Sequence, residues 1–501
     1  MTLSQAVWRN FLGDAPSWYK QVLLGFLLLN PLVVYFGGSQ GSLVAGWLLL
    51  IEFIFTLVMA LKCYPLLPGG LLAIQAVAMG LTTPRAIYEA TLSAYPTLLL
   101  LIFMVAGIYF LKELLLSLFT RLLLGVHSRV LLAFMMFLSS AILSAFMDAL
   151  AVVAVLITVG TAFYQVFHRH ACGVHPEAEH DLERDEPLQE HHREDLLAFR
   201  AFLRGLIMHA VVGSALGGAM TLVGQPQNPL IAKHAGWSFV EFFLQLAPVS
   251  LPALFVGLVL CLVLERLRWF GYGTALPTGV RQVLAQHHAQ QRARRTPRDR
   301  ALRLAQAGVA VAMVLALVFH VAEAGLIGLA VIILATALGG VTQEQRIAKA
   351  FETALPFTCL LVVFFTVVAV LHDQHVFEPI LTAVLEQQGK TQLAMFYLAN
   401  AGLAALSDNV FVATIYITEL KAALLVGAIP AERFEALAVA ISAGTNLASI
   451  ATPNGQAAFL FLLASALAPL LRLSYGRMLW MALPYAVSVT ATGLWALVTL
   501  S

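Results

Sequence analysis

Two aspartates have the chemistry that stands out in this chain, because Asp148 and Asp408 are each alone in a long apolar stretch. Their surroundings repeat weakly: residues 141–150 read AILSAFMDAL and residues 401–410 read AGLAALSDNV. Burial away from water disfavours a charged carboxylate, whereas a bound proton or a nearby cation stabilises the group. Each aspartate is therefore suited to hold either a proton or an alkali-metal ion, and competition between the two ions is the minimum requirement for exchange.

A second pair of segments supplies oxygen ligands. Residues 213–228 and 444–455 share Gly, Leu, Thr and Gly at matching positions, and both contain proline and amide side chains. Proline and glycine interrupt helical hydrogen bonding, so we predict unwound backbone at Gly224–Asn228 and Thr452–Gly455, with free carbonyl oxygens suited to sodium or lithium. The candidate ion- and proton-binding residues are Asp148, Asp408, Asn409, Ser144, Ser407, Thr221, Gly224, Gln225, Pro226, Asn228, Asn446, Ser449, Thr452, Pro453, Asn454 and Gly455, with Na+ held at Asp148 and Asp408.

A structural role is the alternative for these residues. Aspartate commonly caps a helix by accepting hydrogen bonds from its first backbone amides, and prolines and glycines can simply kink a span for packing. Capping and ion binding are compatible, since a cap at the tip of a half-helix would place the acid at the site. An acid within a membrane is costly enough to indicate function, and the paired repetition favours ion binding.

The elements that must position these residues are transmembrane helices. The chain is 60% hydrophobic and 11% charged, against about 25% charged residues in soluble domains. Its long apolar runs approach the roughly 20 residues that cross a bilayer as a helix. We predict an all-α polytopic membrane protein with about eleven spans plus two re-entrant hairpins. The spans fall near 22–37, 43–61, 70–82, 96–118, 205–232, 247–264, 303–320, 325–341, 353–371, 436–470 and 478–500, and the hairpins near 130–167 and 392–419.

The charges orient this layout. With a cytoplasmic N-terminus, most of the 29 lysines and arginines lie inside, as the positive-inside rule requires, and the C-terminus is periplasmic. An odd number of crossings separates the halves, which predicts inverted repeats. The predicted units are 1–42 (N-terminal segment and first span), 43–264 (first repeat, hairpin near 130–167, broken helix near 205–232), 265–302 (cytoplasmic basic linker resting against anionic headgroups) and 303–501 (second repeat, hairpin near 392–419, broken helix near 436–470).

Other polar residues give weaker signals. For Glu52 and Glu113, snorkelling or an ion pair with a nearby lysine explains the position as well as transport does. His209 is predicted near a helix start, with a structural role or a proton-relay role. The histidines of the loop 168–204 favour a solvated segment over metal binding or pH sensing. The scattered cysteines read as reduced thiols, and nothing indicates nucleic-acid binding.

Seven segments resemble the NhaB sodium/proton antiporters of Gram-negative bacteria. They are spread along the whole chain and read WRNFLG (8–13), EFIFTL (52–57), ALKCYPLLPGG (60–70), RWFGYG (268–273), SDNVF (407–411), ATPNGQAAF (451–459) and RLSYGRM (472–478). The resemblance implies a secondary transporter of the bacterial inner membrane that exchanges Na+ or Li+ for H+ and contributes to pH homeostasis. It also implies a homodimer embedded in lipid, with no cofactor beyond the transported ions and no enzymatic activity. Two titratable acids allow more than one proton per turnover, so the exchange is expected to be electrogenic.

Two alternatives remain beside exchange. The first is a Na+- or H+-coupled carrier of dicarboxylate or arsenite with the same fold. Anion-carrying relatives resemble one another in having Ser-Asn-Thr hairpin tips, whereas the tips here are Asp148-Ala149-Leu150 and Asp408-Asn409-Val410, which would repel an anion. The second is an intramembrane aspartyl hydrolase, whose expected tyrosine or paired-glycine context is missing around both acids.

Overall fold

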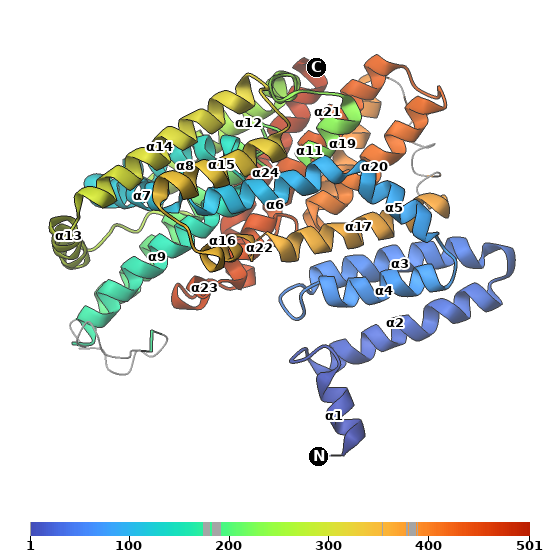
Figure 1. Cartoon of the computed structure of the whole chain (residues 1–501), viewed down its shortest axis with the longest axis horizontal. Helices are drawn as coiled ribbons and strands as arrows, with labels where there is room; N and C mark the ends of the chain where they lie inside the picture. The colour runs from blue at the N-terminus through green and yellow to red at the C-terminus, as the bar shows by residue number, and fades with distance from the viewer. Residues whose placement is uncertain are drawn as a thin grey trace.

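The structure is a computed structural model that describes residues 2–173, 181–182, 192–352, 354–376, 379, 387 and 389–500. The described chain is helical, with no β-strand (Figure 1). The first part contains α1 (Leu3–Asn10), α2 (Ser17–Phe36), η1 (Gly38–Gln40), α3 (Gly41–Val58), α4 (Leu66–Ala78), α5 (Pro84–Ser93), α6 (Tyr95–Tyr109), α7 (Lys112–Gly125), α8 (Arg129–Phe146), α9 (Ala149–Ala171), α10 (Arg193–Gly218), α11 (Asn228–Ala235) and α12 (Phe239–Leu267). The second part contains α13 (Thr278–Ala293), α14 (Pro297–Val318), α15 (Ala324–Gly339), α16 (Glu344–Phe351), α17 (Leu355–Asp373), α19 (Gly389–Leu406), α20 (Asn409–Leu425), α21 (Ala431–Ala448), η3 (Ser449–Ala451), α22 (Ala457–Ala464), α23 (Leu467–Leu470) and α24 (Tyr475–Leu500).

The helices agree with a polytopic membrane protein. Within the described ranges, 10 helices are long and apolar enough to cross a membrane, or 11 if the bent pair α5 and α6 counts as one span. Several predicted spans have other bounds. The predicted span 96–118 consists of two helices, α6 and α7, and the predicted hairpin 130–167 consists of α8 and α9, each of which passes the length and hydropathy test. The histidine-rich loop lies largely outside the described residues, at 174–180 and 183–191.

Close helix packing occurs in the same way within each half. α8 packs along α10, and α19 packs along α21. A side chain at Gly213 would place its Cβ 2.3 Å from the Phe137 carbonyl oxygen, and one at Gly444 would place it 2.7 Å from the Tyr397 carbonyl oxygen. Small residues allow such backbone approach in membrane proteins. The same glycine-to-carbonyl contact therefore occurs in each half.

Other helices pack against one another around the pairs α8–α10 and α19–α21. α6 packs on α15, α4 packs on α17, and α12 packs on α24. α2, α3 and α4 lie side by side at one edge of the molecule (Figure 1). Contacts also cross between the halves, because α22 packs on α9 and α11 packs on α20.

Glu52 lies between the helices of that edge. It is 2% exposed and accepts a 2.7 Å hydrogen bond from Nδ2 of Asn30, which also donates to Gln75. Glu52 therefore does not snorkel to the surface, and that interpretation is wrong. Asn30 comes from α2 and Gln75 from α4, so the burial of Glu52 depends on packing between spans.

Candidate functional site

Asp148 and Asp408 line one cavity. The cavity has a volume of about 480 Å3 and is walled mainly by apolar side chains. Its lining residues come from α3 and the loop after it, from α6, α9, α17 and α22, and from the two aspartates: Leu57, Ala60, Leu61, Tyr64, Pro65, Leu101, Val105, Asp148, Leu150, Ala151, Glu352, Ala354, Pro356, Phe357, Leu360, Asp408, Asn454, Ala457, Leu460, Phe461 and Ala464. The structure thus brings together two acids that are far apart in the sequence.

Asp148 is the N-cap of α9. The helix α8 ends at Phe146, and the extended backbone of Met147 leads to Asp148, whose Oδ1 accepts a 3.3 Å hydrogen bond from the Leu150 amide. The residue is 2% exposed, and its Oδ2 has no hydrogen-bond partner among the described residues. Capping thus fixes one carboxylate oxygen and leaves the other for a proton or a cation.

Asp408 has the same role at the start of α20. Its Oδ1 accepts hydrogen bonds from the amides of Val410 at 2.9 Å and Phe411 at 3.2 Å. The residue is 8% exposed and follows the C-terminal end of α19, as Asp148 follows α8. The predicted capping role is therefore confirmed for both acids, and it holds each carboxyl group at the cavity wall.

Two helix breaks face the caps. The chain between α10 and α11, residues 219–227, is non-helical, and so are residues 452–456 between η3 and α22. Thr221 donates a hydrogen bond through Oγ1 to the Ala145 carbonyl, and Thr452 donates one of 2.7 Å to the Ala405 carbonyl. Each threonine therefore ties a helix break to the helix that precedes an aspartate cap.

Glycine is required at both breaks because backbone fills the space around it. A Cβ at Gly224 would lie 2.5 Å from the Gly218 oxygen and 2.6 Å from the Ser144 oxygen. A Cβ at Gly455 would lie 2.4 Å from the Ala404 oxygen and 2.9 Å from the Ser449 oxygen. The close approach of these carbonyl oxygens leaves no room for a side chain at either break.

Three amide side chains join the break after α10 to α21. Gln227 donates a 2.7 Å hydrogen bond to Oδ1 of Asn446, and Nδ2 of Asn446 donates a 3.0 Å hydrogen bond to Oδ1 of Asn228. Asn228 in turn donates to the carbonyls of Gly218 and Thr221. All three amides are buried, so this amide bridge connects the break after α10 to α21 away from solvent.

The other candidate residues fall into two groups. Asn454 lines the cavity with the aspartates, donates to the Val58 carbonyl at 3.2 Å and to Tyr475 at 3.3 Å, and has an Oδ1 without a partner in the described chain. The rest surround the breaks and caps without lining the cavity, namely Ser144, Ser407, Asn409, Thr221, Gly224, Gln225, Pro226, Asn228, Asn446, Ser449, Thr452, Pro453 and Gly455. Several of these side chains are satisfied by helix carbonyls, as Ser407 is by Leu403 at 3.0 Å and Ser449 is by Asn446 at 2.9 Å.

Sequence reasoning missed four residues of this region. Gln227 belongs to the amide bridge, and Gln456 accepts a 3.4 Å hydrogen bond from Asn409. Both are amides within the repeated Pro/Asn segments, which is a signal that could have identified them. Tyr64 and Glu352 line the cavity from the loop before α4 and from the α16–α17 junction, and no local pattern marks them.

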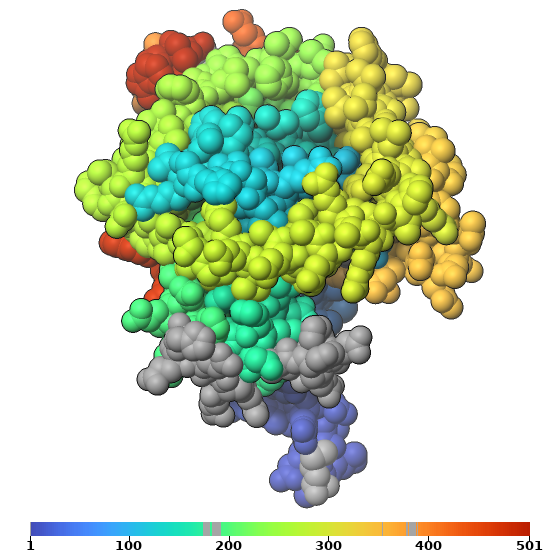
Figure 2. Space-filling model, turned by 90° about the vertical axis from the view of Figure 1, so that its left-hand side faces the viewer, coloured from blue at the N-terminus to red at the C-terminus, as the bar shows by residue number. Residues whose placement is uncertain are grey.

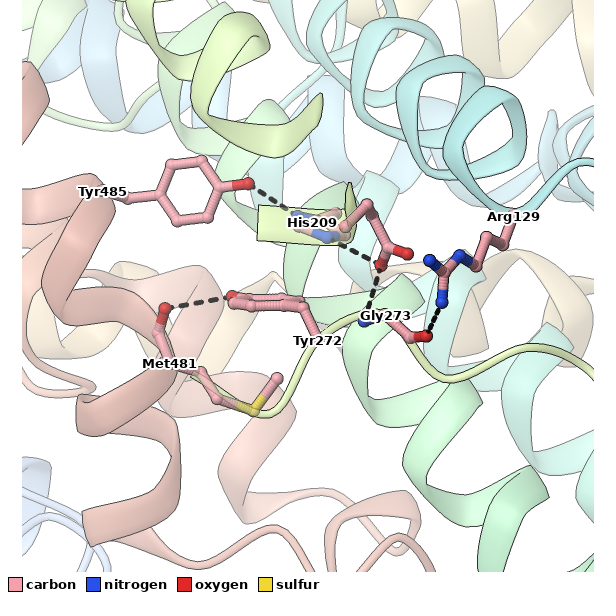
Figure 3. A network of polar contacts seen from close by, with 7 residues as sticks. Arg129, His209, Tyr272, Gly273, Met481 and Tyr485 are labelled. Carbon is pink, nitrogen blue, oxygen red and sulfur yellow. Dashed lines mark hydrogen bonds and ion pairs between the residues drawn. The ribbon is translucent and has the colours of Figure 1, made fainter. Parts of the chain in front are cut away.

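His209 does not line the aspartate cavity but belongs to a separate network of polar contacts (Figure 3). It is fully buried within α10, its Nδ1 lies 2.6 Å from the Tyr485 hydroxyl and its Nε2 lies 3.1 Å from Glu265, while its ring stacks on Tyr272. The predicted position near a helix start is wrong because α10 begins at Arg193. None of these residues lines the aspartate cavity, and the network joins α10, α12 and α24.

The sequence of the whole chain is similar to those of known proteins. The chain matches the family described as "Bacterial Na+/H+ antiporter B (NhaB)" over residues 1–500. It is 58% identical to the Na(+)/H(+) antiporter NhaB of Pseudomonas fluorescens (strain Pf0-1) over 495 residues, which cover 99% of this chain and 98% of the relative. It is 57% identical to the protein of that name from Klebsiella pneumoniae over 494 residues, which cover 99% and 95%. A solved structure of MtrF from Neisseria gonorrhoeae, titled as illuminating a class of antimetabolite efflux pumps, covers 80% of both chains with 15% identity and a TM-score of 0.48.

Proposed function

Because this chain belongs to the NhaB family of bacterial Na+/H+ antiporters and exchanges sodium ions for protons, we propose that Asp148 and Asp408 are the carboxylates at which the two ions compete. The observation that carries this proposal is that both acids line one cavity. The cargo is Na+, or Li+ of similar ligand preference, and H+. The chain therefore acts as a transporter of the bacterial inner membrane and not as an enzyme.

The cap geometry supports a specific division of labour within each carboxyl group. Backbone amides hold Oδ1 in both aspartates, so the ion is exchanged at Oδ2. In the proton-loaded form Oδ2 carries the hydrogen. A sodium ion arriving in the cavity favours the carboxylate, and the released proton passes to water in the cavity. Asn454 contributes a neutral oxygen ligand through its Oδ1.

Two inverted repeats, within 43–264 and 303–501, form the proposed framework of this site. The bounds of α8 and α19 differ by the same 260 residues as the two aspartates (389 − 129 and 408 − 148), and so do the first residues of α9 and α20. The paired threonine and glycine contacts at the two breaks support the same relation. α8–α9 and α19–α20 are then the re-entrant hairpins, and α10–α11 and α21–α22 are the broken helices that line the ion path.

The proposed topology has a cytoplasmic N-terminus and a periplasmic C-terminus. The cavity is bordered by exposed Leu61 and Glu352, which neighbour Lys62 and Lys349 of the predicted inside segments. The described conformation is accordingly inward-facing. Two exchanging acids per cavity make the exchange electrogenic, with more than one proton per sodium ion, and the protein functions as a homodimer within the lipid bilayer.

An anion-coupled carrier is not favoured. Two carboxylates at the cavity wall would repel a dicarboxylate, and the relatives are named as Na+/H+ antiporters.

A titration of purified protein with Na+ tests the site directly. Proton release should accompany sodium binding. Because protons compete with sodium, each decrease of one pH unit should lower the apparent sodium affinity about tenfold for each proton displaced. Sodium binding without proton release, or exchange that is unaffected when both aspartates are replaced by asparagine, would contradict the assignment.

A further inference from the structure

A second cavity lies away from the aspartates, between α7, α9, α13 and α14. Its volume is about 240 Å3, and none of its lining residues lines the aspartate cavity. The helix α13 packs on α7 and α9, and in Figure 2 it crosses this face as a yellow-green band between the cyan residues of α7 and α8 and the blue-green residues of α9. We call this cavity the basic pocket, lined by Glu113, Leu116, Ser117, Thr120, Thr158, Val159, Ala162, Phe163, Val166, Leu284, His287, His288, Gln291, Arg295 and Arg303.

Positive charge is concentrated in the basic pocket. Arg295 and Arg303 line it with His287 and His288, and Arg121 and Arg292 add to the positive potential. Burial and the neighbouring Arg295, Arg292 and Arg121 lower the pKa of His288. Burial and repulsion by Arg303, Arg121 and Arg292 also lower the pKa of Arg295, against one attractive neighbour, Asp299. Among the described residues, Glu113 is the one carboxylate that lines the pocket.

The ligand type follows from these donors. Guanidinium groups present several N–H donors in a plane that matches the oxygens of a phosphate group. The hydroxyl groups of Ser117 and Thr120 add neutral donors at the same cavity, whereas that of Thr158 donates to the Ala154 carbonyl. An anion with several oxygens would relieve the repulsion between Arg295 and Arg303.

The surroundings of the pocket are apolar on one side. Leu284, Phe163 and Val166 form part of its wall. Next to Arg303, the exposed Leu304, Val311 and Leu315 follow one face of α14, which is the pattern of a lipid-facing helix. The volume is smaller than the roughly 300–1,000 Å3 of pockets that enclose a whole drug-sized ligand. The occupant therefore combines a small phosphate-bearing group with a long apolar part that lies outside the pocket.

We propose that the basic pocket binds the phosphate headgroup of an anionic phospholipid, with Arg295 and Arg303 on the phosphate oxygens and the acyl chains along the exposed face of α14. Basic pockets between membrane helices on the cytoplasmic side are suited to this class of lipid. The assignment to the cytoplasmic leaflet rests on the topology proposed above. The lipid site itself does not depend on the aspartates, so the two proposals can fail separately.

Binding of a soluble short-chain phosphatidylglycerol to the purified full-length protein in uncharged detergent tests the proposal. The R295Q/R303Q variant should bind this lipid about 25-fold more weakly than the unchanged protein, from roughly fivefold per arginine near an anionic group. R298Q/R300Q is the matched control, because it removes two charges from exposed arginines of the same segment that do not line the pocket. Short-chain phosphatidylcholine and inorganic phosphate are the comparison ligands.

The outcomes separate the explanations. A loss confined to R295Q/R303Q, with weak binding of phosphatidylcholine and phosphate, supports the lipid site. Equal losses in both double variants show a diffuse charge effect and overturn it. Binding of inorganic phosphate as tight as that of phosphatidylglycerol overturns the choice of a lipid. Circular dichroism and Na+/H+ exchange in zwitterionic vesicles, both expected to be unchanged, verify that R295Q/R303Q is folded.

Discussion

Replacing Asp408 separates its capping role from its ion-binding role. The Asp408→Asn variant would keep the acceptor that Val410 and Phe411 use at 2.9 and 3.2 Å, whereas Asp408→Ala would remove it. Asparagine and aspartate cap helices equally well, so Asp408→Asn should change the free energy of unfolding by less than about 0.5 kcal/mol, and Asp408→Ala should cost about 1–2 kcal/mol. A difference between the two variants in thermal unfolding reports the cap alone.

The ion-binding role appears in transport. One charge about 4 Å from a sodium ion contributes about 4 kcal/mol at an effective dielectric constant of about 20, which is about a thousandfold in affinity. Asp408→Asn should therefore raise the sodium concentration for half-maximal exchange beyond the measurable range. The assay is proteoliposomes that contain a pH-sensitive dye, pulsed with increasing sodium. If Asp408→Asn exchanges with unchanged sodium dependence, the carboxylate is only a cap and the reasoning is refuted.

Three other variants and one control variant test the site and its surroundings. Gly455→Ala should lower the free energy of unfolding by about 1–3 kcal/mol because its Cβ would meet two carbonyl oxygens, whereas Gly402→Ala on α19, with open space around it, should be neutral or stabilising in the same unfolding assay. Asn446→Ala should cost about 1–3 kcal/mol because Gln227 and Asn228 lose their buried partner, and a stability equal to that of the unchanged protein would show that the amide bridge is unimportant. Tyr485→Phe should cost about 1 kcal/mol through its lost hydrogen bond to His209 while leaving the sodium dependence of exchange unchanged, and a shifted sodium dependence would show that this network takes part in transport.

The sequence predicted the parts of the site that depend on local patterns. The isolated acids, the helix breaks at 224–228 and 452–455 and the capping alternative all follow from residue type and spacing, and the structure confirms the breaks and the caps, with Asn228 already the first residue of α11. The parts of the structure that depend on packing between spans could not be predicted from local sequence patterns. Glu52 is buried because Asn30 of α2 and the helix α4 cover it, which no pattern around residue 52 indicates.

Helix boundaries were predicted wrongly where a helical segment is rich in charged residues. α10 begins at Arg193 although its first turns are rich in charged residues, and this charge suggested a loop up to residue 204. The basic linker 265–302 contains the helix α13, whose apolar positions such as Val280 and Leu284 are few but buried against α7 and α9. The loop predicted up to residue 204 is wrong because tertiary packing stabilises helices whose own sequences are weakly apolar, and α13 is a further helix of this kind.

The amide bridge has a consequence for coupling. Asn446 hydrogen bonds to both Gln227 and Asn228, so a displacement of one broken helix is transmitted to the other unless two hydrogen bonds open where no water can replace them. In the proposed mechanism, this constraint would keep both acids facing the same compartment, so that neither ion would cross without the other. The tight coupling of sodium movement to proton movement would then depend on one uncharged side chain, that of Asn446.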